Sequence, residues 1–318
     1  MRRIEVIIAA AGLTLFIIVA SRIGMADVIR QLQAIPIALP ILIGLSFLRL
    51  VLQTLSWSKA LRAEGIRCSS MELIGIRMAA QSLGYVSAVG LAVSEPMKLK
   101  LLGKSLQNAI SPTLADTIVY GFSSASFGFA GCLFAGLAMD YGKHLAASAA
   151  LGAVFGAGLY LIGRRRPLLS PLVRRLSLRC PRWLSRGEQI EVAIRQFRAR
   201  HQNTVGRMFW LNLGCQVLLA GEVAAVLWIL RMPFHAGIVL ALEAASRAVK
   251  MAAGWMPARI GADETGTVAA FAALGLPSSS GLALALTRRA RDLLVCVLGF
   301  GWLLWRTRRL GGFRSENG

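Results

Sequence analysis

Long runs of apolar residues alternate along the chain with short polar breaks, and each run has about the length that crosses a bilayer. Such runs cover residues 4–21, 36–57, 113–139, 145–162, 208–230 and 281–305. A helix needs about 20 apolar residues to cross the hydrocarbon core. Most of these runs are apolar on every face, which the polar shell of a soluble protein could not bury. The pattern therefore predicts six transmembrane helices.

Two further apolar stretches are interrupted by charged residues in the same order. The first carries Arg77 and, 18 residues later, Glu95, whereas the second carries Arg247 and, 17 residues later, Glu264. A duplicated charged break in a membrane sequence is a common sign of a substrate site near the bilayer midplane. We expect each stretch to form a re-entrant hairpin of two half-helices, which is tolerated where its broken backbone is buried or lines a cavity.

The basic residues set the expected topology. Arg2 and Arg3 precede the first run, eleven arginines lie between Arg164 and Arg200, and four more follow the last run. Because cytoplasmic loops of membrane proteins carry an excess of arginine and lysine, we expect these segments and both termini in the cytoplasm. Three crossings then separate the two interrupted stretches, so the hairpins are expected to enter from opposite faces.

Together these elements predict an all-α polytopic membrane protein with six full transmembrane helices and two re-entrant helical hairpins in inverted repeat. The chain, residues 1–318, is expected to form a single integral membrane domain. Its first repeat covers about residues 69–162 and its second about residues 207–305, and a basic cytoplasmic loop of about residues 163–204 connects them. A plain eight-helix bundle with kinks is the alternative.

Composition agrees with a membrane protein. Hydrophobic residues make up 56% of the chain and the mean hydropathy is +0.61, above the range of soluble domains. The formal net charge of +21 is concentrated in one connecting loop and the C-terminal segment, so no nucleic acid is expected as a partner. The five cysteines and three histidines are scattered without a disulfide or metal-ligand pattern, and no cofactor is implied.

Charged residues inside a bilayer helix cost roughly 2.5–3.5 kcal/mol each on insertion scales, so each is expected to have a partner or a role. Glu95 and Glu264 are expected at the starts of the returning half-helices. Ser94 would cap the first half-helix, with Pro96 just inside it, and Asp263 would cap the second. Such helix N-termini attract phosphate, and a glutamate there neutralises the helix dipole, takes up a proton or cation, or meets a lipid amine. Capping without substrate contact is the alternative.

The cations of the entering arms are the natural partners of these two glutamates. They are Arg77, Arg247, Lys250 and Arg259. Arg247 and Lys250 share a helix face with Glu243, so ion pairs within that face are an alternative. Arg49 and Glu222 also fall inside predicted helices, where a structural ion pair is expected.

The last apolar run carries an unusual cluster of charges. Arg288, Arg289, Arg291 and Asp292 lie about two turns inside the run, which is too deep for snorkelling alone. Arg288 and Asp292 are spaced i, i+4 and are expected to pair. Asp116, after the first hairpin, is the expected counterpart of this cluster.

Enzymatic activity is not expected. The chain has no G-x-S-x-G, no H-E-x-x-H and no glycine-rich phosphate loop. A membrane-embedded transferase that uses Glu264 or Asp263 as its base on a lipid phosphate remains an alternative.

The run from Pro257 to Glu264, with its P-x-x-x-G-x-x-E core, and the R-x-x-x-D from Arg288 to Asp292 resemble the lysylphosphatidylglycerol synthase transmembrane-region (flippase-like) family. The segment upstream of Arg247 looks closest to the hopanoid-biosynthesis-associated branch. The resemblance covers nearly the whole chain. It implies a multi-pass protein of the bacterial inner membrane that translocates lipids, and it does not imply aminoacyl-lipid synthesis by this chain alone.

On this interpretation the charged residues line a central cavity for a lipid headgroup, which is anionic or belongs to a terpenoid lipid. The candidate substrate-binding residues are Arg77, Glu95, Arg247, Lys250, Arg259, Asp263, Glu264, Arg288, Arg289 and Asp292. Two other functions stay open. They are the transferase and a non-transporting scaffold of lipid biosynthesis that recruits an enzyme through the loop from Arg164 to Arg200.

Overall fold

The computed structural model describes residues 35–87, 90–103, 106–138, 194–232, 235–253, 256 and 259–315, together with residues 152 and 192. The apolar runs at 4–21 and 145–162 and most of the basic loop lie outside the described residues. What the sequence predicts for them stays a prediction.

The described part of the chain is built of helices. They are α3 (Ile35–Ala63), α4 (Ser70–Val86), α5 (Gly90–Leu102), α6 (Leu106–Ala138), α10 (Gln202–Ile229), α11 (Ala236–Ala252), α12 (Ala262–Ala273) and α13 (Ser278–Ser315). By length and composition, α3, α6 and α10 each contain a segment able to cross a membrane. The helix α13 has 38 residues, and the charged cluster of the last apolar run lies in its first half. The predicted all-α, multi-pass fold is confirmed at this level.

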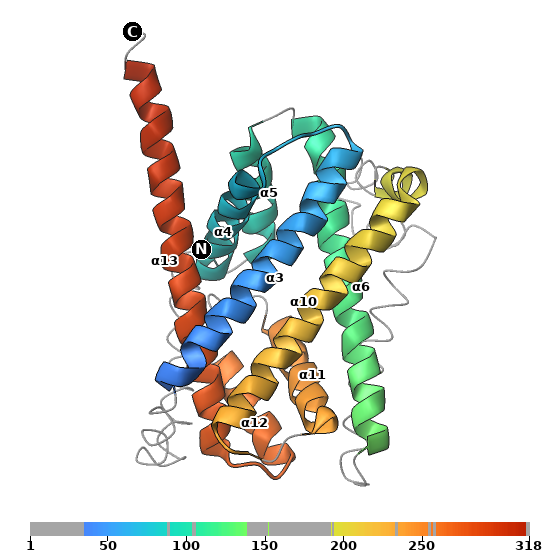
Figure 1. The fold of residues 1–318 in the computed structure, drawn as a ribbon, viewed down its shortest axis with the longest axis vertical. Helices are drawn as coiled ribbons and strands as arrows, with labels where there is room; N and C mark the ends of the chain where they lie inside the picture. The colour runs from blue at the N-terminus through green and yellow to red at the C-terminus, as the bar shows by residue number, and fades with distance from the viewer. Residues whose placement is uncertain are drawn as a thin grey trace, which may run out of the picture.

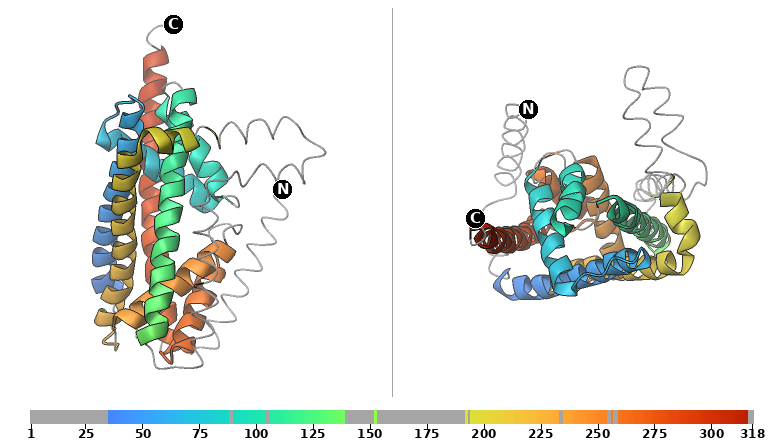
Figure 2. Two further views of the ribbon diagram at one scale, coloured as in Figure 1. Left: turned by 90° about the vertical axis from the view of Figure 1, so that its right-hand side faces the viewer. Right: turned by 90° about the horizontal axis from the view of Figure 1, so that it is seen from above.

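Two pairs of short helices lie at opposite ends of the long ones (Figure 1). The first hairpin, α4 and α5, occupies the end where α13 finishes. The second hairpin, α11 and α12, occupies the end where α13 begins. The long helices α3 and α10 pack side by side and run in opposite directions, and seen from above they form one side of the bundle (Figure 2). The first hairpin lies between α13 and α6 in that view.

Each hairpin has its own apolar core against the long helices. Beneath the first hairpin, Trp57 of α3 is fully buried and packs with residues of α4, α5 and α6. Beneath the second hairpin, Phe271 of α12 is fully buried among leucines and valines of α3, α10, α11 and α13. Burial of such side chains contributes roughly 1.5–3 kcal/mol each relative to water, and it fixes both hairpins to the same long helices.

The break in the first hairpin lies earlier than the sequence suggested. The helix α4 ends at Val86 and α5 begins at Gly90, so Glu95 and Pro96 lie inside α5 rather than at its start, and the predicted cap at Ser94 is wrong. Glycine is the physical reason. A Cβ on Gly84 would lie only 2.8 Å from the carbonyl oxygen of Gly90, so the tight turn requires small residues there.

The break in the second hairpin lies where it was predicted, between the end of α11 and the start of α12. Gly261 ends the connection with φ 80°, a conformation that favours glycine. Arg259 has φ 49°, which is uncommon for a residue with a Cβ. Local strain of this kind persists where surrounding contacts hold the backbone in place.

The helix α13 links the two hairpins, since it packs against α12 near its start and against α4 farther along. Arg306 of α13 donates to Glu72 Oε1 at 3.1 Å and to the carbonyl oxygen of Leu101 at 2.8 Å, so it contacts both arms of the first hairpin at their open end. Its neighbour Trp302 lies directly on Gly75 of α4.

We expect Gly75→Ala to destabilise the protein by about 1–3 kcal/mol, because the added methyl group would overlap the Trp302 ring. The matched control is Gly121→Ala in α6, where an added Cβ meets nothing within 4 Å and the higher helix propensity of alanine is expected to be neutral or stabilising. Thermal unfolding in detergent measures both. Equal melting temperatures for the two variants would contradict the close packing of α13 on α4.

Candidate functional site

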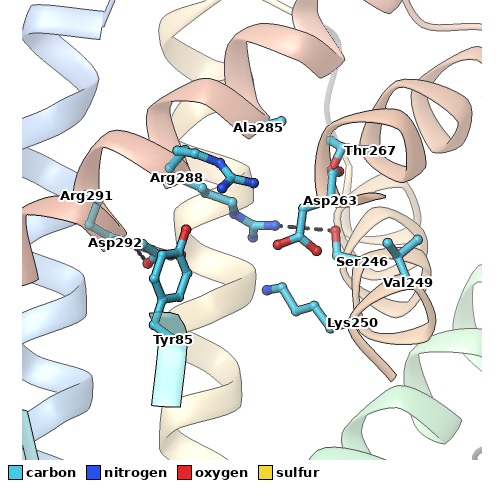
Figure 3. Close-up of a pocket in the computed structure, with 11 residues that line it drawn as sticks. Tyr85, Ser246, Val249, Lys250, Asp263, Thr267, Ala285, Arg288, Arg291 and Asp292 are labelled. Atoms are coloured by element: carbon cyan, nitrogen blue, oxygen red, sulfur yellow. Dashed lines mark hydrogen bonds and ion pairs between the residues drawn. The ribbon is translucent and has the colours of Figure 1, made fainter. Parts of the chain in front are cut away.

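A polar pocket lies where the tip of the first hairpin, the second hairpin and α13 come together (Figure 3). Its lining consists of Tyr85, Ser246, Val249, Lys250, Asp263, Thr267, Ala285, Arg288, Arg289, Arg291 and Asp292. The empty space between these side chains is about 420 Å³, including its open mouth. Four cations and two carboxylates share this lining.

Two fully buried glutamates hold the arginines of α13 in place. Glu243 of α11 accepts from Arg288 Nη2 at 3.0 Å and from Arg247 Nη2 at 3.1 Å. Glu222 of α10 accepts from Arg291 Nη1, and its Oε2 lies 3.9 Å from Arg288 Nε. Glu222 and Glu243 are 0% and 1% exposed, so solvent does not screen these pairs. They fix where the guanidinium groups point.

Polar groups of neighbouring helices extend this buried network. Ser46 of α3 donates to Glu222 Oε1 at 2.9 Å. Arg247 Nη1 donates to Gln216 Oε1 at 2.6 Å and to Ser124 Oγ at 2.5 Å. The network therefore joins α3, α6, α10, α11 and α13.

The start of α12 carries two carboxylates with different partners. Glu264 accepts from the backbone N–H of Gly261 at 2.9 Å through Oε2, and its Oε1 lies 2.6 Å from Arg289 Nη2. Asp263 accepts from Arg259 Nε at 3.0 Å. The predicted cap at Asp263 is therefore wrong, because Gly261 is the N-cap residue and Glu264 satisfies its N–H. Glu264 both caps α12 and holds a pocket arginine.

One cation and one carboxylate oxygen of the pocket are left without a direct partner. Among the residues that the structure describes, Lys250 Nζ makes no hydrogen bond and no ion pair, and in Figure 3 it points into the space below Asp263. The Oδ1 atom of Asp263 is buried and has no hydrogen-bond partner in the described part of the chain. A buried acceptor without a donor costs free energy, which a ligand that donates to Asp263 Oδ1 would recover. Lys250 Nζ is available to an anionic group of the same ligand.

The tips of the two hairpins meet at the pocket. The guanidinium carbon of Arg259, in the break of the second hairpin, lies 6.0 Å from the ring centre of Tyr85 near the end of α4. This is the outer limit for an attraction between a cation and an aromatic ring. The strained Arg259 backbone and its bond to Asp263 thus lie at the contact between the hairpins.

A second charged cluster lies beneath the first hairpin. Arg77 of α4 pairs with Asp116 of α6, and Asp116 Oδ1 also accepts from Ser56 Oγ at 2.7 Å. Lys98 and Glu95 of α5 pair with each other at 2.7 Å. Arg77 and Lys98 also lie over the ring of Trp57, at 5.7 and 5.9 Å from its centre. Trp57 itself donates to Thr113 Oγ1 at 3.1 Å.

The structure separates the predicted site residues into two groups. Lys250, Asp263, Arg288, Arg289 and Asp292 line the pocket. Arg247, Arg259 and Glu264 contact that lining from behind, whereas Arg77 and Glu95 belong to the cluster of the first hairpin.

Several predicted pairings are wrong. The cations of the entering arms do not pair with Glu95 and Glu264, whose partners are Lys98 and Arg289. Asp292 pairs with Arg291 at 2.8 Å, while Arg288 turns to Glu243. Glu222 pairs with Arg291 instead of Arg49. For Arg288, a spacing rule along one helix yielded to a partner on another helix, which sequence spacing does not reveal. The alternative pair of Glu243 with Arg247 is present.

Sequence reasoning missed four contributors to the site. Tyr85, Ser246 and Thr267 are single polar groups in apolar helices, and no pattern around them marks a site. Glu222 was noticed only as half of an ion pair, although a lone carboxylate in a membrane-spanning helix is itself a signal. In the described residues, no group of three histidines, cysteines or carboxylates gathers as metal ligands would.

Fold and site together define a multi-pass α-helical membrane protein with a charged pocket between two helical hairpins. A model of the lysylphosphatidylglycerol synthase TM region matches residues 4–299, and the chain therefore belongs to that family. No curated protein and no solved structure shows a significant match to the chain. The resemblance seen in the sequence is confirmed at the level of the family.

We expect Glu222→Gln to lower the free energy of unfolding by about 3–5 kcal/mol, because it leaves the guanidinium of Arg291 buried without its charge partner on α10. The control is Glu64→Gln, since Glu64 meets His201 at 3.4 Å with both side chains about a quarter exposed and is expected to contribute about 0–1 kcal/mol. Thermal or denaturant unfolding in detergent compares them. Equal losses in both variants would refute an anchoring role for Glu222.

Proposed function

We propose that the protein is a lipid translocase, which moves a lipid headgroup across the bacterial inner membrane through the charged pocket. The convergence of Lys250 with Arg288 and Arg289 on one pocket between two hairpins carries this proposal. Charges are expensive inside a bilayer and are retained there where they serve a polar substrate. A phosphate-bearing headgroup is the natural substrate for such cations.

The two hairpins supply a route for alternating access. They lie at opposite ends of the long helices, and the pocket lies where their tips meet (Figure 1). We infer that they form an inverted repeat, in which motion of one hairpin against the long helices opens the pocket to one side of the membrane at a time. The contact between Tyr85 and Arg259 would be broken and remade in this cycle.

The exposed cations suggest the orientation. Figure 1 shows that α3 and α13 end, and α10 begins, at the end of the bundle that holds the open end of the first hairpin. The exposed cations in or next to these element ends and the end of α5 are Lys59, Arg62, Arg67, Lys100, Arg195, Arg198, Arg200, Arg207 and Arg308. Of the described arginines and lysines, the opposite end exposes Arg231. By the positive-inside rule we assign the first end, with both termini, to the cytoplasm.

The proposal is translocation without catalysis. Membrane lipids are the proposed partners, and the loop from Arg164 to Arg200 is a proposed docking place for an enzyme of lipid biosynthesis. Membership of the hopanoid-associated branch remains a prediction from the residues upstream of Arg247.

Reconstituted protein is expected to move lipids with a fluorescent acyl chain between leaflets. Glu264→Gln releases Arg289 and Arg288→Ala removes a pocket cation, so each is expected to slow flipping about tenfold or more, as for the loss of one charged hydrogen bond. Quenching of the outer leaflet with a membrane-impermeant reductant measures the rate.

Arg308→Gln is the matched control, since this exposed arginine lies at the far end of α13 and is expected to keep the normal rate. Elution as a single species in size exclusion confirms folding of each variant. Flipping that survives in both pocket variants would remove these residues from the mechanism. No flipping of any headgroup by the unmodified chain would favour a scaffold.

The assigned orientation is tested with truncated fusions in a bacterial host. A fusion after Gly65, between α3 and α4, is expected to give a fluorescent reporter that folds in the cytoplasm. A fusion after Met232, between α10 and α11, is expected to give active alkaline phosphatase outside the inner membrane. The reverse result at either position would overturn the assigned topology.

A further inference from the structure

Around the pocket, the described cations outnumber the described carboxylates by one. The pocket lining and the residues that pair with it contain six cations, Arg247, Lys250, Arg259, Arg288, Arg289 and Arg291, and five carboxylates, Glu222, Glu243, Asp263, Glu264 and Asp292. All six except Lys250 form ion pairs within the described residues. The six cations exceed the five carboxylates by one positive charge, and the cation without an ion pair is Lys250.

Other charges near the pocket do not change the conclusion that Lys250 is the unpaired cation. Arg49 of α3 is close enough to Asp292 to act on it electrostatically, but it does not line the pocket. The connection between α11 and α12 contributes no other charge beyond Arg259, because residues 253–258 are uncharged in the sequence. A ligand that enters the pocket therefore meets Lys250 as the directly available cation.

A second group in the pocket, the carboxylate of Asp263, has an oxygen that lacks a hydrogen-bond donor. Asp263 uses Oδ2 to accept from Arg259, while its Oδ1 is buried and has no donor. Asp292, the other carboxylate of the lining, already accepts from Arg291 Nε at 3.0 Å and Nη2 at 2.8 Å. Among the described residues the pocket thus presents one free cation, Lys250, and the carboxylate of Asp263, which lies beside it in Figure 3 and has one oxygen without a donor.

We propose that the pocket selects a phosphodiester headgroup whose alcohol carries a hydrogen-bond donor, with the phosphate on Lys250 and the donor on Asp263 Oδ1. This inference rests on the proposed function and names the substrate class of the same site. The donor is a hydroxyl or a protonated amine. A phosphomonoester lacks that alcohol, and a quaternary ammonium headgroup has no N–H to donate.

Lipids that differ in one feature of the headgroup test the selection. All carry the same fluorescent acyl chain in proteoliposomes. Phosphatidylethanolamine and phosphatidylglycerol are expected to move readily. Phosphatidylcholine, which lacks a donor, and phosphatidic acid, which lacks the alcohol, are expected to move about tenfold more slowly, as for one missing hydrogen bond to a charged group. Equal rates for phosphatidylethanolamine and phosphatidylcholine would overturn the proposal.

Two variants connect this selection to the named residues. Asp263→Ala is expected to abolish the preference for phosphatidylethanolamine over phosphatidylcholine, whereas Asp292→Asn is expected to keep that ratio even where the overall rate falls. Lys250→Gln is expected to slow both favoured lipids about tenfold, and Lys250→Arg to retain most of the rate. A preference that survives Asp263→Ala, or a normal rate in Lys250→Gln, would refute these assignments.

A binding measurement separates this inference from the proposed transport. The melting temperature of the purified protein is measured with dihexanoyl phosphatidylethanolamine, dihexanoyl phosphatidylcholine, whose acylated glycerol leaves no hydroxyl, and inorganic phosphate. Stabilisation by the first alone, lost in Lys250→Gln, would support the selection even where no lipid is flipped, and transport alone would then fail. Equal stabilisation by all three would indicate a general anion site and would overturn the selection.

Discussion

The requirement that every buried charge have a partner organises the second half of this molecule. Glu222 and Glu243 are buried among apolar helices, and an arginine of α13 supplies the opposite charge to each of them. The same pairs prevent Arg288 and Arg291 from turning toward other groups. Because the bilayer core offers no water to replace a lost partner, these pairs fix the position of α13 against α10 and α11. The pocket is the space that remains between charges held in this way.

The sequence predicted the described long helices, the two hairpins and most of the charged residues that line the pocket, because these depend on apolar length and on charges that are rare in such surroundings. It failed for the pairings and for the first break. Spacing along one helix favoured Arg288 with Asp292, but the bond of Arg288 is to Glu243, 45 residues away. Proline at position 96 suggested a helix start, whereas the close contact of Gly84 with Gly90 decided where the chain turns. Both errors concern contacts between elements, which no local pattern contains.

In each half an ion pair links the first arm of the hairpin to the long helix that follows, and the two pairs have opposite polarity. In the first half, Arg77 on the first arm of the hairpin binds Asp116 on the long helix that follows. In the second half, the first arm supplies the carboxylate, Glu243, and the following long helix supplies the cation, Arg288. When the cation and the carboxylate exchange places, the hairpin arm is still linked to the long helix. The charge that remains available to a ligand is different. Beneath the first hairpin, Asp116 and Glu95 are matched by Arg77 and Lys98, whereas in the second half Lys250 has no ion pair among the described residues.

The helix α13 connects the ion pairs of the pocket to the first hairpin. Arg288 and Arg306 are separated by 18 residues of one continuous helix, a distance of about 27 Å along its axis. One end holds the pocket arginines, and the other holds both arms of the first hairpin through Glu72 and the carbonyl of Leu101. Trp302 on Gly75 leaves little room for α13 to slide along α4 without displacing it. A ligand that shifts α13 at the pocket would therefore also move the first hairpin, and the motions of the two hairpins would be coupled through α13.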